Sequence, residues 1–323
     1  MSIGVSLRAF LLLSVVSVAA PASAQEDYPA RDIHAIVGFA AGSGADVIAR
    51  YFGEQLKQRA GKPVIIENKP GASGALAGTA AAQAKPNGYT IYFTGAASIS
   101  TNLYLFKTLG YDPVKDFAAV APLLVQPFIL VVDPKAGVGS VAELTARLKQ
   151  KGDKANYAAP NSTSWAVAEL YKAAVGVPTL RIQYRDAASA LNDMLAGQID
   201  LWFADPVFAL ENSRAGRLKA LAVTTPTRMA AIPELPTMAE QGMKGIEVLS
   251  WWSVQVPTGT PPDIIAKLNR WFTDSVKSEE TRKFLATFGA DPFPGTPEEL
   301  RAFHLKEIES WARIAAIAKF EKQ

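Results

Sequence analysis

The stretch VGFAAGSGADVIAR, residues 37–50, decides the fold class. It begins as an apolar strand, breaks at the small residues 40–44 and restarts as a helix. Gly42 and Gly44 let another molecule approach the main chain closely, and the free N–H groups of a helix start carry partial positive charge. The turn therefore suits a carboxylate or a phosphate. The plainer interpretation is a tight strand-to-helix turn in which Asp46 complements the helix dipole, and this stretch alone favours that interpretation.

The rest of the chain alternates short β-rich runs with amphipathic stretches. Strands are expected at residues 33–39, 64–67, 90–94, 128–132, 180–184, 199–203 and 218–223. Helices are expected at residues 45–60, 75–84, 141–149, 164–175 and 187–196. Repeated alternation of strand and helix predicts an α/β fold with parallel sheets and helices on both of their faces.

The first 24 residues have the pattern of a secretory signal peptide. Arg8 is their only charged residue, residues 9–20 are almost wholly apolar, and Ala22-Ser23-Ala24 offers a small-residue cleavage site. The apolar run is shorter than the roughly 18 residues of a membrane span, which disfavours a transmembrane anchor. The sequence therefore predicts a soluble, exported protein.

Composition limits the possible functions. Of the 323 residues, 49% are hydrophobic, and the formal net charge is +3, or 3 − 1 = +2 without Arg8. This small charge, spread over the chain, does not indicate a nucleic-acid partner. The chain has no Cys, so disulfides, Cys nucleophiles and lipid-modified Cys are excluded. After cleavage 323 − 24 = 299 residues remain, which suggests two domains.

Two extended runs ending in prolines look like crossings between these domains, at residues 128–132 and 248–256. We therefore expect a signal peptide at residues 1–24, a first lobe at residues 25–127 plus 250–323, and a second lobe at residues 128–249. Helices at residues 262–277, 279–288 and 297–318 would complete the first lobe. Two lobes joined by two strands can close over a small ligand by hinge bending.

Patterns for catalysis and metal binding are weak. His34 and His304 are the only histidines, and a structural role explains each better than general-base work. The chain has no GxSxG, HExxH, calcium-loop or Walker sequence. We expect no catalytic residue, no metal and no cofactor.

A second loop that precedes a predicted helix offers more hydrogen-bonding groups. The sequence APNSTSW, residues 159–165, presents hydroxyls, an amide and helix-start N–H groups together. Such a cluster can cap its own helix, or it can donate several hydrogen bonds to one carboxylate. Together with the turn at Gly42 in the other lobe, it would form a two-sided carboxylate clamp.

An ordered set of motifs resembles the Bug or TctC family of periplasmic solute-binding receptors of tripartite tricarboxylate transporters. Besides the turn at residues 39–50, the motifs are ENKPGASG (67–74), PNGYTI (86–91), YDP (111–113), LAGQID (195–200), GRLKALAVT (216–224) and LPT (235–237). The resemblance spans nearly the whole mature chain. It implies a two-lobed, Venus-flytrap protein of type II-like architecture, with two sheets joined by two crossing strands and a ligand in the cleft.

The resemblance also implies which residues contact the ligand, partly through water. These are Ala40, Ala41, Gly42, Ser43, Gly44, Ala45, Ser98, Asn161, Ser162, Thr163, Ser164 and Asp205. Asp205 would contact the ligand through water or a ligand ammonium group, or would simply cap a helix. Ala41 and Ser43 stand where the family has proline and glycine, and Trp165 stands where it often has His.

Three further side chains are candidates with open alternatives. Arg185 would pair with a second carboxylate of the ligand or form a surface ion pair with Asp186. Trp165 and Trp202 would stack on an aromatic acid or pack in the core, which is the default for Trp.

The expected function is capture of a small organic carboxylate, either a di- or tricarboxylate or an aromatic acid. A monomeric receptor would bind this anion in the periplasm and offer it to the membrane subunits of a tripartite transporter, without covalent chemistry. Two other classes stay open. One is an exported serine hydrolase using Ser98, Ser162 or Ser164, which lacks a suitably placed His, and the other is a ligand-sensing module for a membrane partner.

Overall fold

A computed structural model describes residues 1, 27–229, 232–318 and 322 of the protein. The expected signal peptide lies almost entirely outside these residues and stays a prediction. Within the described part of the chain, no helix is both long enough and apolar enough to span a membrane.

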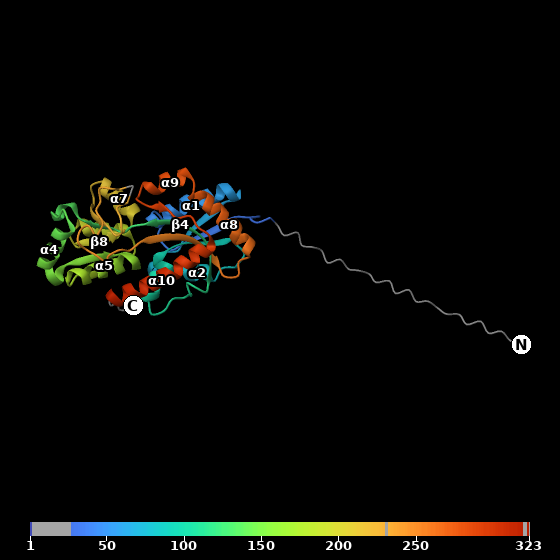
Figure 1. The fold of residues 1–323 in the computed structure, drawn as a ribbon, viewed down its shortest axis with the longest axis horizontal. Coiled ribbons are helices and arrows are strands. Elements are labelled where there is room, and N and C mark those ends of the chain that lie inside the picture. The colour runs from blue at the N-terminus through green and yellow to red at the C-terminus, as the bar shows by residue number, and fades with distance from the viewer. Residues whose placement is uncertain (2–26, 230–231, 319–321, 323) are drawn as a thin grey trace.

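The first of two sheets, sheet A, has the strand order β11-β4-β10-β3-β1-β2. Its strands are β1 (Ile33–Val37), β2 (Val64–Asn68), β3 (Thr90–Gly95), β4 (Phe117–Gln126), β10 (Ser250–Pro257) and β11 (Asp291–Pro292). The helices on this side are α1 (Gly44–Ala60), α2 (Ala75–Ala82), α3 (Asn102–Leu105), α8 (Pro262–Val276), α9 (Glu279–Ala286) and α10 (Pro297–Ala318). Helices α1, α2, α8 and α10 pack directly against its strands (Figure 1).

The second sheet, sheet B, has the strand order β7-β6-β8-β5-β9. Its strands are β5 (Ile129–Val132), β6 (Asn156–Ala159), β7 (Leu180–Gln183), β8 (Leu201–Ala204) and β9 (Lys219–Val223). Its helices are α4 (Val141–Lys151), α5 (Ser162–Val175), α6 (Ala187–Leu195) and α7 (Pro206–Arg214). Figure 1 shows this green and yellow half beside the half that contains α1, α2 and α8.

The α/β class is confirmed, but the expectation of parallel sheets was wrong, because both sheets are mixed. In sheet A, β1 is parallel to β2 and β3, whereas β10 is antiparallel to β3 and β4. In sheet B, β6 is parallel to β7 and β8, whereas β5 is antiparallel to β8 and β9. The chain leaves sheet A along β4 and returns along β10, so the two crossing strands necessarily run in opposite directions where they pair.

Three chain segments are tied together where the chain passes between the sheets. Thr224, which follows β9 and is fully buried, exchanges hydrogen bonds with Phe128 on one side and Val248 on the other. Phe128 N–H donates to Thr224 Oγ1 at 2.8 Å, and Thr224 Oγ1 donates to Val248 O at 2.7 Å. Backbone bonds of 3.0 Å join the same pairs. The lobe limits expected at residues 127 and 250 flank this cluster and stay a prediction.

The two halves also share packing. One cluster of buried apolar side chains extends from Phe93 and Leu123 in sheet A to Val131 and Trp202 in sheet B. Helix α10, drawn in red in Figure 1, contacts both β4 and α5. Its His304 is buried, with Nε2 2.7 Å from Ile99 O, which agrees with a structural role.

Candidate functional site

A cavity lies between the two sheets, where the first turns of α1, α5, α6 and α7 come together. Its lining residues are Phe39, Ala40, Ser43, Gly44, Ala45, Gly95, Ala96, Ala97, Gln126, Phe128, Pro160, Asn161, Thr163, Arg185, Asp186, Ala187, Asp205, Ser250 and Trp252. The cavity volume is about 90 Å³, on a scale where one water needs roughly 10 to 15 Å³. It therefore has room for a small molecule of several heavy atoms.

Each of the four helices begins with a side chain that caps it. In every case the cap accepts a hydrogen bond from the backbone N–H three residues later, and the caps are Ser43 for α1 (3.3 Å), Asn161 for α5 (2.8 Å), Asp186 for α6 (2.8 Å) and Asp205 for α7 (3.1 Å). The caps of α1 and α5 are neutral, whereas those of α6 and α7 are acidic. The caps of α1 and α5 thus add no negative charge to these helix starts, although Asp46 lies in the first turn of α1, whereas α6 and α7 each have an acidic cap.

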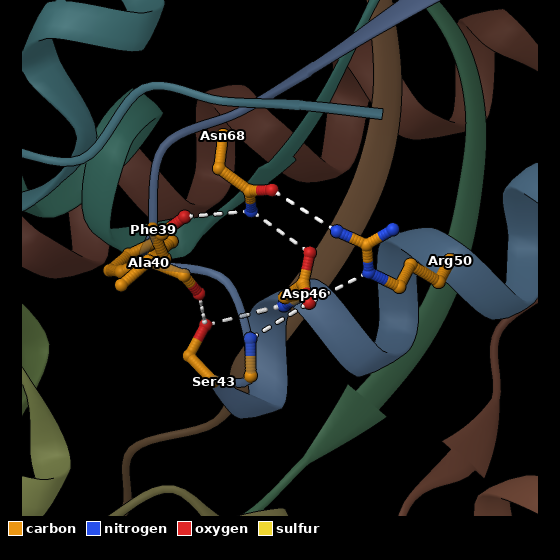
Figure 2. Close-up of polar contacts among 7 residues, drawn as sticks. Phe39, Ala40, Ser43, Asp46, Arg50 and Asn68 are labelled. Atoms are coloured by element: carbon orange, nitrogen blue, oxygen red, sulfur yellow. Dashed lines mark hydrogen bonds and ion pairs between the residues drawn. The ribbon is translucent and has the colours of Figure 1, made fainter. Parts of the chain in front are cut away.

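The turn before α1 uses part of its anion-binding capacity internally (Figure 2). The buried Asp46 carboxylate accepts hydrogen bonds from Gly42 N–H at 2.9 Å, Asn68 Nδ2 at 2.9 Å and Arg50 Nε at 2.8 Å. Burial alone would raise the Asp46 pKa, but the bonds from Arg50, Gly42 and Asn68 outweigh it and hold that pKa below its usual value. The Gly42 amide is therefore occupied by the chain's own carboxylate.

The next two amides of α1 remain available. Within the described part of the chain, the N–H groups of Gly44 and Ala45 make no hydrogen bond, and both residues line the cavity. Gly44 also allows the two halves to meet, since a Cβ there would lie 2.4 Å from Asp205 Oδ1 and 3.0 Å from Val207 Cβ. The site thus needs glycine at position 44 for reasons of space.

The loop before α5 divides into residues that face the cavity and residues that serve the fold. Asn161 and Thr163 line the cavity, and Thr163 Oγ1 lies 3.3 Å from Thr101 Oγ1 on the sheet A side. Ser164 Oγ donates to Phe203 O at 2.6 Å. Ser162 Oγ is buried without a partner in the described chain.

The structure brings eight of the fourteen predicted site residues to this cavity. They are Ala40, Ser43, Gly44, Ala45, Asn161, Thr163, Arg185 and Asp205. The remaining six, Ala41, Gly42, Ser98, Ser162, Ser164 and Trp165, do not line it. Ser98 instead donates to Ser73 O at 3.3 Å, and Arg181 stacks on the Trp165 ring at 3.8 Å.

Neither tryptophan proposed for stacking on a ligand reaches the cavity. Trp202 is 1% exposed and packs against Phe208, with ring centroids 5.4 Å apart. The aromatic wall comes instead from Phe39, Phe128 and Trp252. Sequence reasoning missed these residues because their meeting at one cavity depends on how the two sheets come together, although Phe128 and Trp252 lie within the two crossings expected from the sequence, at residues 128–132 and 248–256.

Arg185 is the one positively charged side chain among the residues that line the inner cavity. It is exposed and lines both the inner cavity and a wider outer one of about 730 Å³, which shares Phe39, Ala40, Pro160, Arg185 and Asp186 with the inner cavity. In the described chain Arg185 has no ion pair, because the Asp186 side chain caps α6 instead. The outer cavity therefore forms a mouth with a free positive charge at its junction with the interior.

Asp205 has an unusual electrostatic environment. Burial raises its pKa from 3.8 to about 6, although hydrogen bonds from backbone N–H groups, that of Phe208 first, act in the opposite direction. The sequence left open whether Asp205 caps a helix or faces the ligand; the structure shows that it caps α7 and that it lines the cavity, and contact with a ligand stays a prediction.

Neither histidine of the chain lies at the cavity. His34 lies on β1, with Nδ1 2.6 Å from Glu67 Oε1, and neither it nor His304 lines the cavity. No cluster of three His, Asp or Glu side chains suited to a metal occurs among the described residues.

Comparison with known proteins decides the family. The sequence model of TctC, described as "Tripartite tricarboxylate transporter family receptor", matches residues 48–319. The chain belongs to this family. BugT of Bordetella pertussis is 32% identical to this TctC member over 307 residues, which cover 94% of each chain. The resemblance seen in the sequence motifs is thereby confirmed.

Solved structures agree with the family assignment. Rpa4515 of R. palustris, solved with adipate, is 31% identical and superimposes with a TM-score of 0.89, covering 92% of this chain and 100% of that one. MatC from Rhodopseudomonas palustris, solved with bound malate, is 29% identical with a TM-score of 0.84, covering 89% and 99%. The two-lobed architecture of periplasmic binding proteins is therefore shared.

Proposed function

We propose that this TctC receptor captures a small organic carboxylate between its two sheets, in the periplasm, and offers it as a monomer to the membrane subunits of a tripartite transporter. One observation carries the proposal: the neutrally capped starts of α1 and α5 and the free cation of Arg185 border the same cavity. The structures of Rpa4515 with adipate and MatC with malate support a dicarboxylate as the ligand class.

The energies are compatible with reversible capture. Taking a carboxylate out of water is costly, and charge-assisted hydrogen bonds of roughly 1.5 to 3 kcal/mol each offset that cost. Three or four such bonds can support micromolar binding, about 8 kcal/mol. The amides of Gly44 and Ala45 and the guanidinium of Arg185 are among the donors on residues that line the cavity, and the hydroxyl of Thr163 can add another where it does not donate to Thr101.

The alternative functions receive less support. A serine hydrolase would need a base beside Ser98, Ser162 or Ser164, but none of these serines lines the cavity and neither histidine does. A sensor would use the same cavity and would differ only in its membrane partner.

A thermal-shift screen of mono-, di- and tricarboxylates tests the proposal. We expect at least one acid to raise the melting temperature, because a ligand at 100 times its Kd stabilises the native state by about 2.7 kcal/mol, or about 5 °C for a chain of this size. Uncharged amides of the same acids serve as controls. If the folded protein shows no shift with any acid, the receptor proposal fails, and turnover of candidate esters would favour the hydrolase.

Arg185 provides a test of ligand class. We expect Arg185→Gln to weaken binding of a dicarboxylate about fivefold, since it removes the cation at the junction of the two cavities, and to change the Kd of a monocarboxylate of similar length less than about twofold. Arg313→Gln, an equal charge change at an exposed position of α10, is the matched control. Equal losses for both acids, measured by calorimetry, would show that Arg185 acts through the overall field and not on a second carboxylate.

A further inference from the structure

Two residues that line the inner cavity each carry a buried polar atom without a hydrogen-bond partner in the described chain. Trp252 Nε1 and Gln126 Oε1 are buried and make no hydrogen bond within the described chain. Both residues line the cavity, and their exposed fractions are 5% and 3%. Buried polar groups in folded proteins are almost always hydrogen-bonded. Two such groups on one cavity indicate that their partner belongs to a ligand.

Strand pairing puts the two side chains on the same face of sheet A. Gln126 at the end of β4 pairs with Ser250 of β10, and no register shift occurs before Trp252, two residues further on. Because side chains alternate along a strand, Ser250 and Trp252 point to the same side as Gln126. Diagonal neighbours of this kind are roughly 7 to 8 Å apart, within reach of large side chains. The two side chains are therefore near enough for one small ligand to contact both.

The neighbouring strand fixes the indole ring in this place. Trp252 also pairs with Gly95 of β3, and a Cβ at Gly95 would lie 3.1 Å from Trp252 Cε2, the ring carbon bonded to Nε1. The ring therefore lies over the glycine, which itself lines the cavity. The Phe39 ring packs on the same indole, with centroids 6.0 Å apart. The indole ring is thus held by packing on carbon, and its N–H makes no hydrogen bond within the described chain.

The hydrogen-bonding capacity of the two atoms selects a chemical group. The Trp252 indole can only donate, and Gln126 Oε1 can only accept. A hydroxyl group accepts one bond and donates another, so it satisfies both at once. A carboxylate has no hydrogen to give to Gln126 Oε1 and could bond this side chain only through the amide Nε2. We propose that Trp252 and Gln126 form a hydroxyl-binding subsite, so that this receptor prefers hydroxycarboxylates to the same acids without the hydroxyl.

This inference rests on the proposed function, because the acid must first be held by its carboxylate. The preference is the ratio of the two Kd values for acids that differ in one hydroxyl. Calorimetry would measure it for malate and succinate, 4-hydroxybutyrate and butyrate, and 4-hydroxybenzoate and benzoate, which vary the distance from hydroxyl to carboxylate. We expect a preference of at least about tenfold for one pair, since a site with buried polar groups rejects the analogue that leaves them unpaired.

Two variants connect that preference to the two side chains. Trp252→Phe removes the indole N–H and keeps an aromatic ring, and Gln126→Met removes the amide at similar length. In each variant we expect the preference to fall below about twofold, because the hydroxylated acid loses its additional hydrogen bond whatever the change in the Kd of the acid without the hydroxyl. Trp202→Phe is the matched control, because Trp202 Nε1 is also buried without a partner in the described chain but does not line the cavity.

The outcomes separate this inference from the function on which it rests. Carboxylates that bind with no hydroxyl preference, or a preference that survives in either variant, would overturn the subsite and leave the receptor function intact. If no acid of any pair binds, the receptor function falls and the subsite with it. Should Trp252→Phe not fold, Gln126→Met alone decides by the same criterion.

Discussion

Gly44→Val is expected to abolish carboxylate binding, with a Kd raised at least about 100-fold. A Cβ at position 44 would lie 2.4 Å from Asp205 Oδ1 and 3.0 Å from Val207 Cβ, and the branched side chain would also enter the cavity beside the Ala45 amide. Either the valine side chain blocks the ligand from the N–H groups at the start of α1, or the start of α7 is displaced from the start of α1. Both remove charge-assisted bonds, and the loss of two such bonds exceeds about 2.7 kcal/mol.

Gly42→Ala is the matched control for that variant. Gly42 has a φ of +79° and nothing within 4 Å of an added Cβ, and it lies outside the cavity. Alanine there should lower the free energy of unfolding by about 1 kcal/mol through backbone strain but leave the Kd nearly unchanged. Calorimetry gives the Kd values, and thermal unfolding shows that both variants fold. Wild-type affinity in folded Gly44→Val would place the site elsewhere.

Asp205→Asn is expected to bind a carboxylate about 30-fold more tightly than the wild type at pH 8 and nearly equally at pH 5. Asp205 lines the cavity next to Gly44, and its pKa of about 6 means that it is largely ionised at pH 8 and largely protonated at pH 5. An ionised Asp205 repels an anionic ligand, at a cost of about 2 kcal/mol for partly screened charges. Wild-type affinity should therefore fall as the pH rises through 6.

The same variant has a predictable effect on stability. The native pKa of Asp205, about 6, lies above its ordinary value of 3.8, so between these values the native state holds the proton that the unfolded state has lost. The free energy of unfolding therefore falls as the pH rises from about 4 to about 6, by up to about 3 kcal/mol. Asparagine also caps helices well, so Asp205→Asn should remove this slope and be more stable than the wild type at pH 8.

Other charged groups near Asp205 could also affect the pH dependence of carboxylate binding. Asp46 on α1 is neutralised by Arg50, and Arg185 and Asp186 line the same cavity at the start of α6. Asp133→Asn, at an acidic cap outside the inner cavity, is the control and should leave the pH profile of binding unchanged. A wild-type affinity that rises with pH would contradict the prediction and would mean that the ligand brings a positive group to Asp205.

The sequence predicted features that depend on a few neighbouring residues. The starts of α1 and α5 could be located because Ser43 and Asn161 cap helices through contacts three residues away. Neighbouring residues alone could not show that the Gly42 N–H donates to the Asp46 carboxylate. The same turn is suited both to binding an external anion and to an internal hydrogen bond with Asp46. The resemblance to the family indicated Asp205 as a site residue. Its position beside Gly44 could not be predicted, because it depends on how the two halves of the structure meet.

The interior of the cavity could not be predicted in the same way. Gln126 and Trp252 are 126 residues apart in the chain and become neighbours only through the pairing of β4 with β10. Strand β4 was not among the expected strands; Pro122 interrupts its apolar run, and proline argues against a strand in the middle of a sheet. Here β11 covers only Leu124 and Val125 on that side, so position 122 tolerates the missing N–H.

Thr224 has a mechanical consequence for any movement of the two sheets. Its bonds to Phe128 and Val248 fasten three passing segments into a single bundle. A twist of one segment is therefore shared by the others, and independent flexing of each would break buried hydrogen bonds. A movement of one sheet relative to the other that keeps these buried bonds would therefore have to turn all three segments together about Thr224.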